Sequence, residues 1–190
     1  MLCRGTSFKI KSTVLQNIQL PYAKVIGMIA FANNLSKKIF QSQISFDEYL
    51  RRAEEKCEEL RHVSSKIDVD DYVYSAEVTK EALGLDDELI DSLLEEYVAQ
   101  IITTLPRFRE MLKQIRKRMK KGEKAEFTQL RELAHKNLGV ARNLHIKDAQ
   151  KILYNIMTSD DIDEVERCLE YLEACTILLK PETAYDAYVS

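Results

Sequence analysis

Apolar side chains recur every three or four residues along most of this chain, a period that predicts helices rather than strands. In the second part of the sequence the pattern indicates a short helix, which ends at Gly84, and four longer helices over 86–122, 123–143, 147–158 and 162–180. Pro106 is expected to kink or split the first of these longer helices. Because their connections are short, neighbouring helices should run antiparallel, and we predict an all-α fold built on an up-down four-helix bundle.

Two further amphipathic helices are predicted nearer the N-terminus, over 22–40 and 45–60. The second begins with the spacing of a capping box, in which Ser45 accepts a backbone N–H and the side chain of Glu48 reaches back to the helix start. Together the two helices should form a hairpin. Its apolar faces would pack on the rest of the chain, or would form a docking surface for a partner or for a second copy in a dimer.

Breaks in the helical pattern divide the chain into four parts. An acidic, extended stretch predicts a linker over 68–76, which would separate an N-terminal helical extension, 1–67, from the bundle at 77–180. Residues 181–190 follow the helix stop Lys180-Pro181 and are expected to form a loose tail.

Composition acts mainly by excluding classes of protein. The net charge of −3 and the pI near 5.7 argue against a general nucleic-acid binder. The four cysteines show neither a CxxC pair nor Cys/His ligand spacing, so we expect no metal site and reduced thiols, as in a cytoplasmic protein. No signal peptide and no membrane-spanning stretch is visible. The sequence also contains no P-loop, GxGxxG or HExxH motif, so a conventional metabolic enzyme is not expected.

A block of lysines and arginines between Arg107 and Lys124 departs from this acidic balance. Two readings are open, a nucleic-acid patch and a surface for an acidic protein partner. The block lacks the interleaved aromatic side chains on which bases stack, so we expect no nucleic acid and favour an acidic protein.

The helix predicted at 123–143 carries a histidine outside its apolar stripe. At about 100° per residue, five apolar side chains share one face: Phe127, Leu130, Ala134, Leu138 and Ala141. His135 falls well off this face, toward solvent, and Gly139 one turn later clears space beside it. Arg131 and Arg142 lie on the same side and would bring positive charge to any group attached there. A lone exposed histidine is usually only a surface residue, so any functional interpretation of His135 depends on the residues on either side of it.

Those flanks resemble the signature of histidine-containing phosphotransfer (HPt) domains. In that family an Ala-His pair lies on a bundle helix, and Lys and Gly follow at the third and fourth positions after the histidine. Within 133–144, Ala134, His135 and Gly139 match this pattern, whereas Leu138 stands where the family has lysine. The resemblance covers the predicted bundle and not the N-terminal third of the chain.

The resemblance implies that His135 accepts a phosphoryl group from a receiver-domain aspartate and passes it on. An exposed imidazole is largely neutral at cytoplasmic pH and therefore has a free lone pair, and phosphoryl transfer needs mainly positioning and charge stabilisation. The receiver would bring the aspartate and Mg²⁺, so we expect no cofactor on this chain. The candidate phosphoryl- and partner-binding residues are Gly139, Arg131, Arg142 and Lys136.

Two hypotheses for function follow. In the first, the chain is a phosphorelay intermediate, rather than a conventional enzyme, whose partners are a response-regulator receiver domain or a hybrid histidine kinase. In the second, a degenerate HPt-like bundle has lost the chemistry and serves as a binding or scaffolding module. The second histidine near this helix, His145, is expected to be a turn or cap residue, because no glycine clears its neighbourhood.

Overall fold

The computed structural model describes residues 44–63 and 74–190, and every regular element in them is an α-helix. The helices are α2 (Phe46–Val63), α3 (Ala76–Leu83), α4 (Asp87–Lys120), α5 (Thr128–Asn143), α6 (Lys147–Thr158), α7 (Ile162–Leu179) and α8 (Pro181–Val189). The predicted all-α class is thus confirmed for this part of the chain. The helix expected over 22–40 and most of the expected linker lie outside the described residues. None of the described helices has the length and hydropathy needed to cross a bilayer.

The helix ends follow local capping signals. Gly84 ends α3 with a left-handed backbone (φ 66°), as its position after the apolar pattern predicted. Two residues later, the side chain of Asp86 accepts the backbone N–H of Leu89 at 2.9 Å and so begins α4. Asp161 caps α7 in the same way, because its carboxylate accepts backbone N–H groups from the first turn. These signals act within a few residues, which is why the sequence alone locates them.

Helix α4 continues for 34 residues through Pro106, so the expectation that this proline splits the helix is wrong. A proline inside a helix costs about 3 kcal/mol because it removes a backbone hydrogen bond. Here the ring lies on the exposed side of α4, whereas its neighbours Leu105 and Phe108 are buried. Each buried side chain of this size contributes about 1.5–3 kcal/mol, so a continuous apolar stripe outweighs the missing hydrogen bond.

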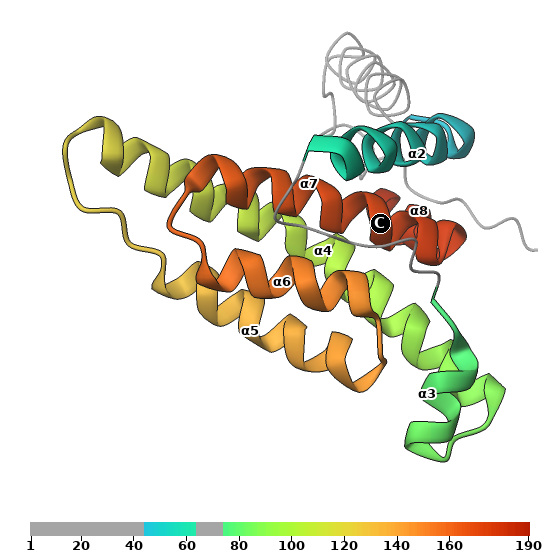
Figure 1. The fold of residues 1–190 in the computed structure, drawn as a ribbon. Helices are drawn as coiled ribbons and strands as arrows, with labels where there is room; N and C mark the ends of the chain where they lie inside the picture. The colour runs from blue at the N-terminus through green and yellow to red at the C-terminus, as the bar shows by residue number, and fades with distance from the viewer. Residues whose placement is uncertain (1–43, 64–73) are drawn as a thin grey trace, which may run out of the picture. The chain divides into compact units, whose positions relative to one another are not determined.

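Helix α7 is the centre of the packing. It contacts α2, α4, α6 and α8, while α5 packs against α4 and α6 (Figure 1). Half of its residues are buried: Ile162, Val165, Cys168, Leu169, Tyr171, Leu172, Ala174, Thr176 and Ile177. A helix that is apolar on most of its circumference has to be covered on most sides. The four neighbours of α7 supply that cover.

Helix α2 packs on α7 and α8 and belongs to the same compact unit, which extends from Ile44 to the end of the chain. Its predicted apolar stripe is buried there, including Tyr49, Ala53, Cys57 and Leu60. The structure therefore groups α2 with the helices that follow it, instead of with an N-terminal extension that ends at residue 67. Sequence could define the stripe of α2 but not the surface that covers it.

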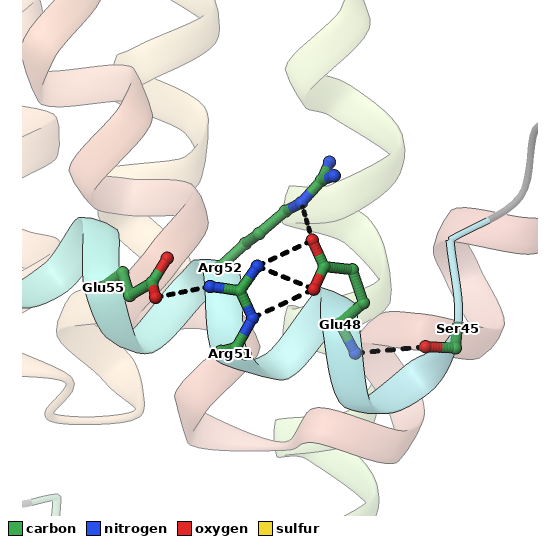
Figure 2. A network of polar contacts seen from close by, with 5 residues as sticks. All are labelled: Ser45, Glu48, Arg51, Arg52 and Glu55. Atoms are coloured by element: carbon green, nitrogen blue, oxygen red, sulfur yellow. Dashed lines mark hydrogen bonds and ion pairs between the residues drawn. The ribbon is translucent and has the colours of Figure 1, made fainter.

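The start of α2 realises half of the predicted capping box. The backbone N–H of Glu48 donates to Ser45 Oγ at 3.2 Å, as expected. The Glu48 carboxylate does not reach back, however, and instead pairs with Arg51 and Arg52 (Figure 2). Two cations three and four residues ahead offer charge-assisted hydrogen bonds, which are stronger than one to a neutral backbone N–H.

The expected loose tail at 181–190 is wrong, because these residues form α8. Proline stops a preceding helix but is favoured in the first turn of a new one, and Pro181 occupies that place. Tyr185 Oη donates to the carbonyl of Ile44 at 2.9 Å, and the Tyr188 ring stacks on Tyr49 with centroids 4.9 Å apart. Residues 181–189 are helical because α2 lies beside them, and this contact cannot be predicted from the local sequence because α2 is far away along the chain.

A buried threonine ties α3 to the end of α5. Thr79 is fully buried, and its hydroxyl donates to the carbonyl of Leu144 at 2.8 Å and also bonds the hydroxyl of Tyr74 at 3.0 Å. We predict that Thr79→Val lowers the free energy of unfolding by about 1–3 kcal/mol, because it leaves the Leu144 carbonyl unpaired at a buried site.

Urea denaturation measures this difference, and Thr103→Val is the matched control. The Thr103 side chain is exposed and bonds only within α4, so its substitution should change stability by less than about 0.5 kcal/mol. An equal loss in both variants would show that removing a threonine hydroxyl from a helix, and not breaking the link between helices, is what lowers stability.

Candidate functional site

The histidine helix, α5, begins at Thr128, later than residue 123 where the pattern predicted. Gly122 has a left-handed backbone (φ 73°) that ends the preceding turn, and Glu126 accepts the backbone N–H of Thr128 at 3.2 Å. The five apolar residues expected on one face of this region are all buried: Phe127, Leu130, Ala134, Leu138 and Ala141. The apolar face of α5 is therefore confirmed, and with it the side of the helix that is left for solvent.

His135 and Gly139 lie on the exposed side of α5, one helical turn apart. Among the described residues, no hydrogen bond or ion pair involves the imidazole of His135, so its ring nitrogens are open to a reactant from outside. A Cβ atom built on Gly139 would meet no other atom within 4 Å. The space beside the histidine is thus real, and glycine there serves neither a tight packing contact nor an unusual backbone angle.

Leu138, which stands where the HPt pattern has lysine, is buried in the core with 1% of its surface exposed. It packs with the apolar face of α5, while His135 points to solvent. In this chain the third position after the histidine therefore contributes to stability. Any cation that assists His135 has to come from elsewhere on the surface.

Arg131 was predicted to flank the histidine, but its guanidinium is held by contacts with other residues. It bonds Asp160 at 2.5 Å and the carbonyl of Ser159 at 3.3 Å, both in the connection between α6 and α7. The same guanidinium lies 5.5 Å from the ring centre of Phe127, a cation–π distance. Arg131 thus joins the start of α5 to the α6–α7 turn, a role that its place in the sequence could not reveal.

Lys136 and Arg142, the other two predicted cations, are exposed on α5. Within residues 44–63 and 74–190, neither side chain forms an ion pair or hydrogen bond. Lys136 directly follows His135, and Arg142 lies two turns after it. Of the three predicted cations, Lys136 and Arg142 are therefore available on the exposed side of α5, whereas Arg131 is bonded to the connection between α6 and α7.

Asn137 is a residue that the sequence pattern placed only at the border of the apolar face. It is buried, and its amide both accepts from Gln100 Nε2 on α4 and donates to the carbonyl of Leu133, each at 2.9 Å. The bond to Gln100 joins α5 to α4, and together with the buried apolar face it favours the rotation of α5 in which His135 is exposed. An amide within an otherwise apolar helix border was the only signal available in the sequence.

His145 lies in the turn that follows α5, two residues after its last residue, Asn143, as expected of a turn residue. It adopts a left-handed backbone (φ 55°), and its N–H donates to the carbonyl of Arg142 at 3.1 Å. Such a φ angle is uncommon outside glycine, although histidine tolerates it better than most residues. Its backbone thus accounts for its presence without any chemical role.

The chain has no match among protein-family models, curated proteins or solved structures. What the molecule can do therefore has to be inferred from the exposed side of α5. That surface offers an accessible nitrogen nucleophile on a rigid helix, open space one turn away, and two cations without partners among the described residues. Such a site suits a reaction whose other components arrive on a second protein.

We predict that a lysine placed at position 138, as the HPt pattern would have it, destabilises this protein. Leu138→Lys would bury an ammonium group and remove apolar contacts, so the free energy of unfolding should fall by about 3 kcal/mol or more. Asn143→Lys is the matched control, since it adds the same side chain at an exposed position in the last turn of the same helix. Urea denaturation distinguishes them, and a stable Leu138→Lys protein would mean that this position can turn toward solvent.

Proposed function

We propose that this chain is a histidine phosphotransfer protein, in which His135 receives a phosphoryl group from one protein and delivers it to another. The single observation that carries the proposal is the exposed His135 with open space at Gly139. A phosphoryl carrier needs an uncrowded nucleophile that a partner's active site can surround, and this geometry meets that need.

Helices α4 to α7 are proposed to be an HPt-like antiparallel four-helix bundle. The contacts support this reading, because α4 packs on α5, α5 on α6, α6 on α7, and α7 again on α4. Such a closed ring, with short connections from α5 to α7, is how an up-down bundle is built. A rigid frame of this kind would hold His135 at a fixed place relative to a docked partner.

The proposed step is a direct displacement at phosphorus. A lone pair on a ring nitrogen of His135 attacks the phosphoryl group of an aspartyl phosphate on a receiver domain. The N–P bond forms as the P–O bond to the aspartate breaks, the aspartate leaves as a carboxylate, and the imidazole loses its N–H proton to water. The Mg²⁺ that neutralises the transferring group would be held by the receiver, and the reverse displacement would pass the group to a second aspartate.

Lys136 and Arg142 are the cations proposed to interact with the phosphorylated histidine. Both are exposed on α5 and unpaired within the described part of the chain, so both can turn toward a new negative charge. The guanidinium of Arg131 is proposed to act indirectly, through the contacts with Asp160 that fix the start of α5. The partner is therefore expected to be a receiver domain, free or within a hybrid histidine kinase.

A second candidate function is a binding module of the same fold without phosphotransfer. The observation in its favour is Leu138, which places a core residue where the related family has its lysine. Under this alternative the exposed side of α5 would still dock a receiver, and His135 would be one contact among others. The two functions differ in one measurable product, phosphohistidine.

We predict that a phosphorylated receiver domain transfers acid-labile phosphate to the wild-type protein and not to His135→Gln. The matched control is His145→Gln, which changes the histidine at the end of the same helix and should be labelled like wild type. A panel of receiver domains from one genome, each phosphorylated chemically, supplies the donors. If every receiver fails to label the protein but some form a stable complex with it, the binding-module alternative is correct.

A second prediction concerns the size of the residue at position 139. Both Gly139→Ala and Gly139→Gln should raise the free energy of unfolding by about 0.5–1 kcal/mol, because the position is helical and unhindered. Only the glutamine should obstruct a docked partner, with the rate of labelling reduced about tenfold or more. If the glutamine variant is labelled as fast as the alanine variant, the partner approaches His135 from another side.

A further inference from the structure

The cations of α4 differ in their surroundings. Two arginines form ion pairs with α7, since Arg109 bonds Glu173, and Arg116 bonds Asp163 and Glu166. These pairs have a structural explanation, because they join two helices that pack together. A further set of cations lies beyond them, at the end of the helix and in the following connection, and we name residues 117–124 the basic arm.

The side chains of the basic arm are all exposed. Figure 1 shows the last turns of α4, in yellow-green, continuing past the start of α7. Three of its lysines, Lys117, Lys120 and Lys121, have no ion pair within the part of the chain that the structure describes. Arg118 and Lys124 lie near Glu126, whose pKa is held below its usual range mainly by hydrogen bonds from Thr128 and also by these two cations.

Fold stability accounts for only part of this cluster. The C-terminal end of a helix favours cations, but this effect falls off within the last turn. The five cations within 117–124 repel one another, and the single carboxylate of this stretch offsets only part of that repulsion. The helical part also has no buried face that would explain its length. Met119, the sole methionine of the arm, is 44% exposed. A segment with these properties is suited to an anionic surface that the folded chain does not itself supply.

A groove of about 490 Å³ lies beside the arm, between α4 and α5. Its apolar lining comes from Met111, Ile115 and Leu130, and Gln114 and Gln129 add amide groups. Arg118 lines the groove and also belongs to the basic arm, so the two features are continuous. The groove thus offers a place for an apolar side chain, next to donors and acceptors that suit a peptide backbone.

We propose that the basic arm and this groove together dock an acidic segment of a protein partner. Carboxylates of the segment would pair with the lysines of the arm, while one apolar side chain would enter the groove. The groove lining reaches Glu132, one helical turn before His135, but does not include the histidine. The proposal holds whether or not that histidine carries a phosphoryl group.

The charge of the arm and the lining of the groove favour an acidic protein over two other anionic partners, a nucleic acid and a membrane surface. The arm has no aromatic side chain on which a base could stack, and Glu126 and Glu132 in the groove lining would repel the closely spaced phosphates of a nucleic acid. A membrane-surface helix needs a broad apolar face, which a lone methionine does not provide. An acidic peptide can place its carboxylates on the arm and keep them away from the two glutamates.

The test is fluorescence anisotropy with the full-length chain and a pair of labelled peptides. Both are rich in glutamate, and they differ only in a central residue, leucine in one and serine in the other. The leucine peptide should bind about tenfold more tightly or better, because burying a leucine contributes about 1.5–3 kcal/mol. Gln129→Trp, which fills the groove at an exposed position, should remove that advantage and leave binding of the serine peptide unchanged.

Charge reversal tests the arm. Lys120→Glu/Lys121→Glu should weaken both peptides about tenfold or more, whereas Arg107→Glu/Lys113→Glu should change binding less than about twofold. The control pair reverses the same number of exposed, unpaired cations on the same helix, outside the arm. Circular dichroism of each variant verifies that the helices are retained.

Three results would overturn the proposal. One is an equal loss of affinity in the two charge-reversal variants, which would reduce the effect to net charge. Another is tighter binding of a single-stranded oligonucleotide than of the leucine peptide, which would identify the arm as a nucleic-acid surface. The third is binding to phosphatidylserine vesicles without binding to either peptide, which would identify it as a membrane surface.

Discussion

The structure depends on the burial of α7, a helix with buried residues around most of its circumference. Such a helix cannot pack on one partner only, and the chain satisfies it with α2, α4, α6 and α8. Two of these, α2 and α8, come from the beginning and the end of the described sequence. They also contact each other, through Tyr185, Tyr188 and Tyr49. The burial of α7 therefore requires α2 and α8, although the local sequence predicts that these segments belong to an extension and a tail.

Helix α5 shows the opposite situation, because neighbouring helices cover only one of its sides. It contacts α4 and α6 with one apolar face and leaves the other side open. Its apolar face, together with the hydrogen bond between Asn137 and Gln100, orients α5 so that Leu138 lies in the core and His135 lies in solvent. Position 138 is therefore committed to packing, so phosphotransfer at His135 would depend on Lys136 and Arg142. The proposed chemistry at His135 and the packing of Leu138 thus place different requirements on positions that lie close together on one helix.

The cations of α4 differ in whether they pair with carboxylates of the neighbouring helix α7. Arg109 and Arg116 have carboxylate partners on α7 and help to join two helices. Exposed pairs of this kind contribute little each, usually below about 1 kcal/mol, so they orient the helices more than they stabilise them. Past the end of that interface, Lys117, Lys120 and Lys121 have no ion pair with any residue that the structure describes. Pairing between helices therefore does not explain these three charges.

Sequence by itself determined whatever depends on near neighbours: the helical class, the caps at Gly84 and Asp86, the apolar stripe of α5, and the exposure of His135. It failed where the deciding contact lies far along the chain. The local sequence predicts that Pro181 ends a helix, whereas in the structure Pro181 begins α8, which packs against α2. The sequence predicts that Arg131 lies beside the histidine, whereas in the structure its guanidinium bonds residues of the α6–α7 turn. Periodicity and capping act over one or two helical turns, whereas burial and ion pairing are settled by the tertiary structure.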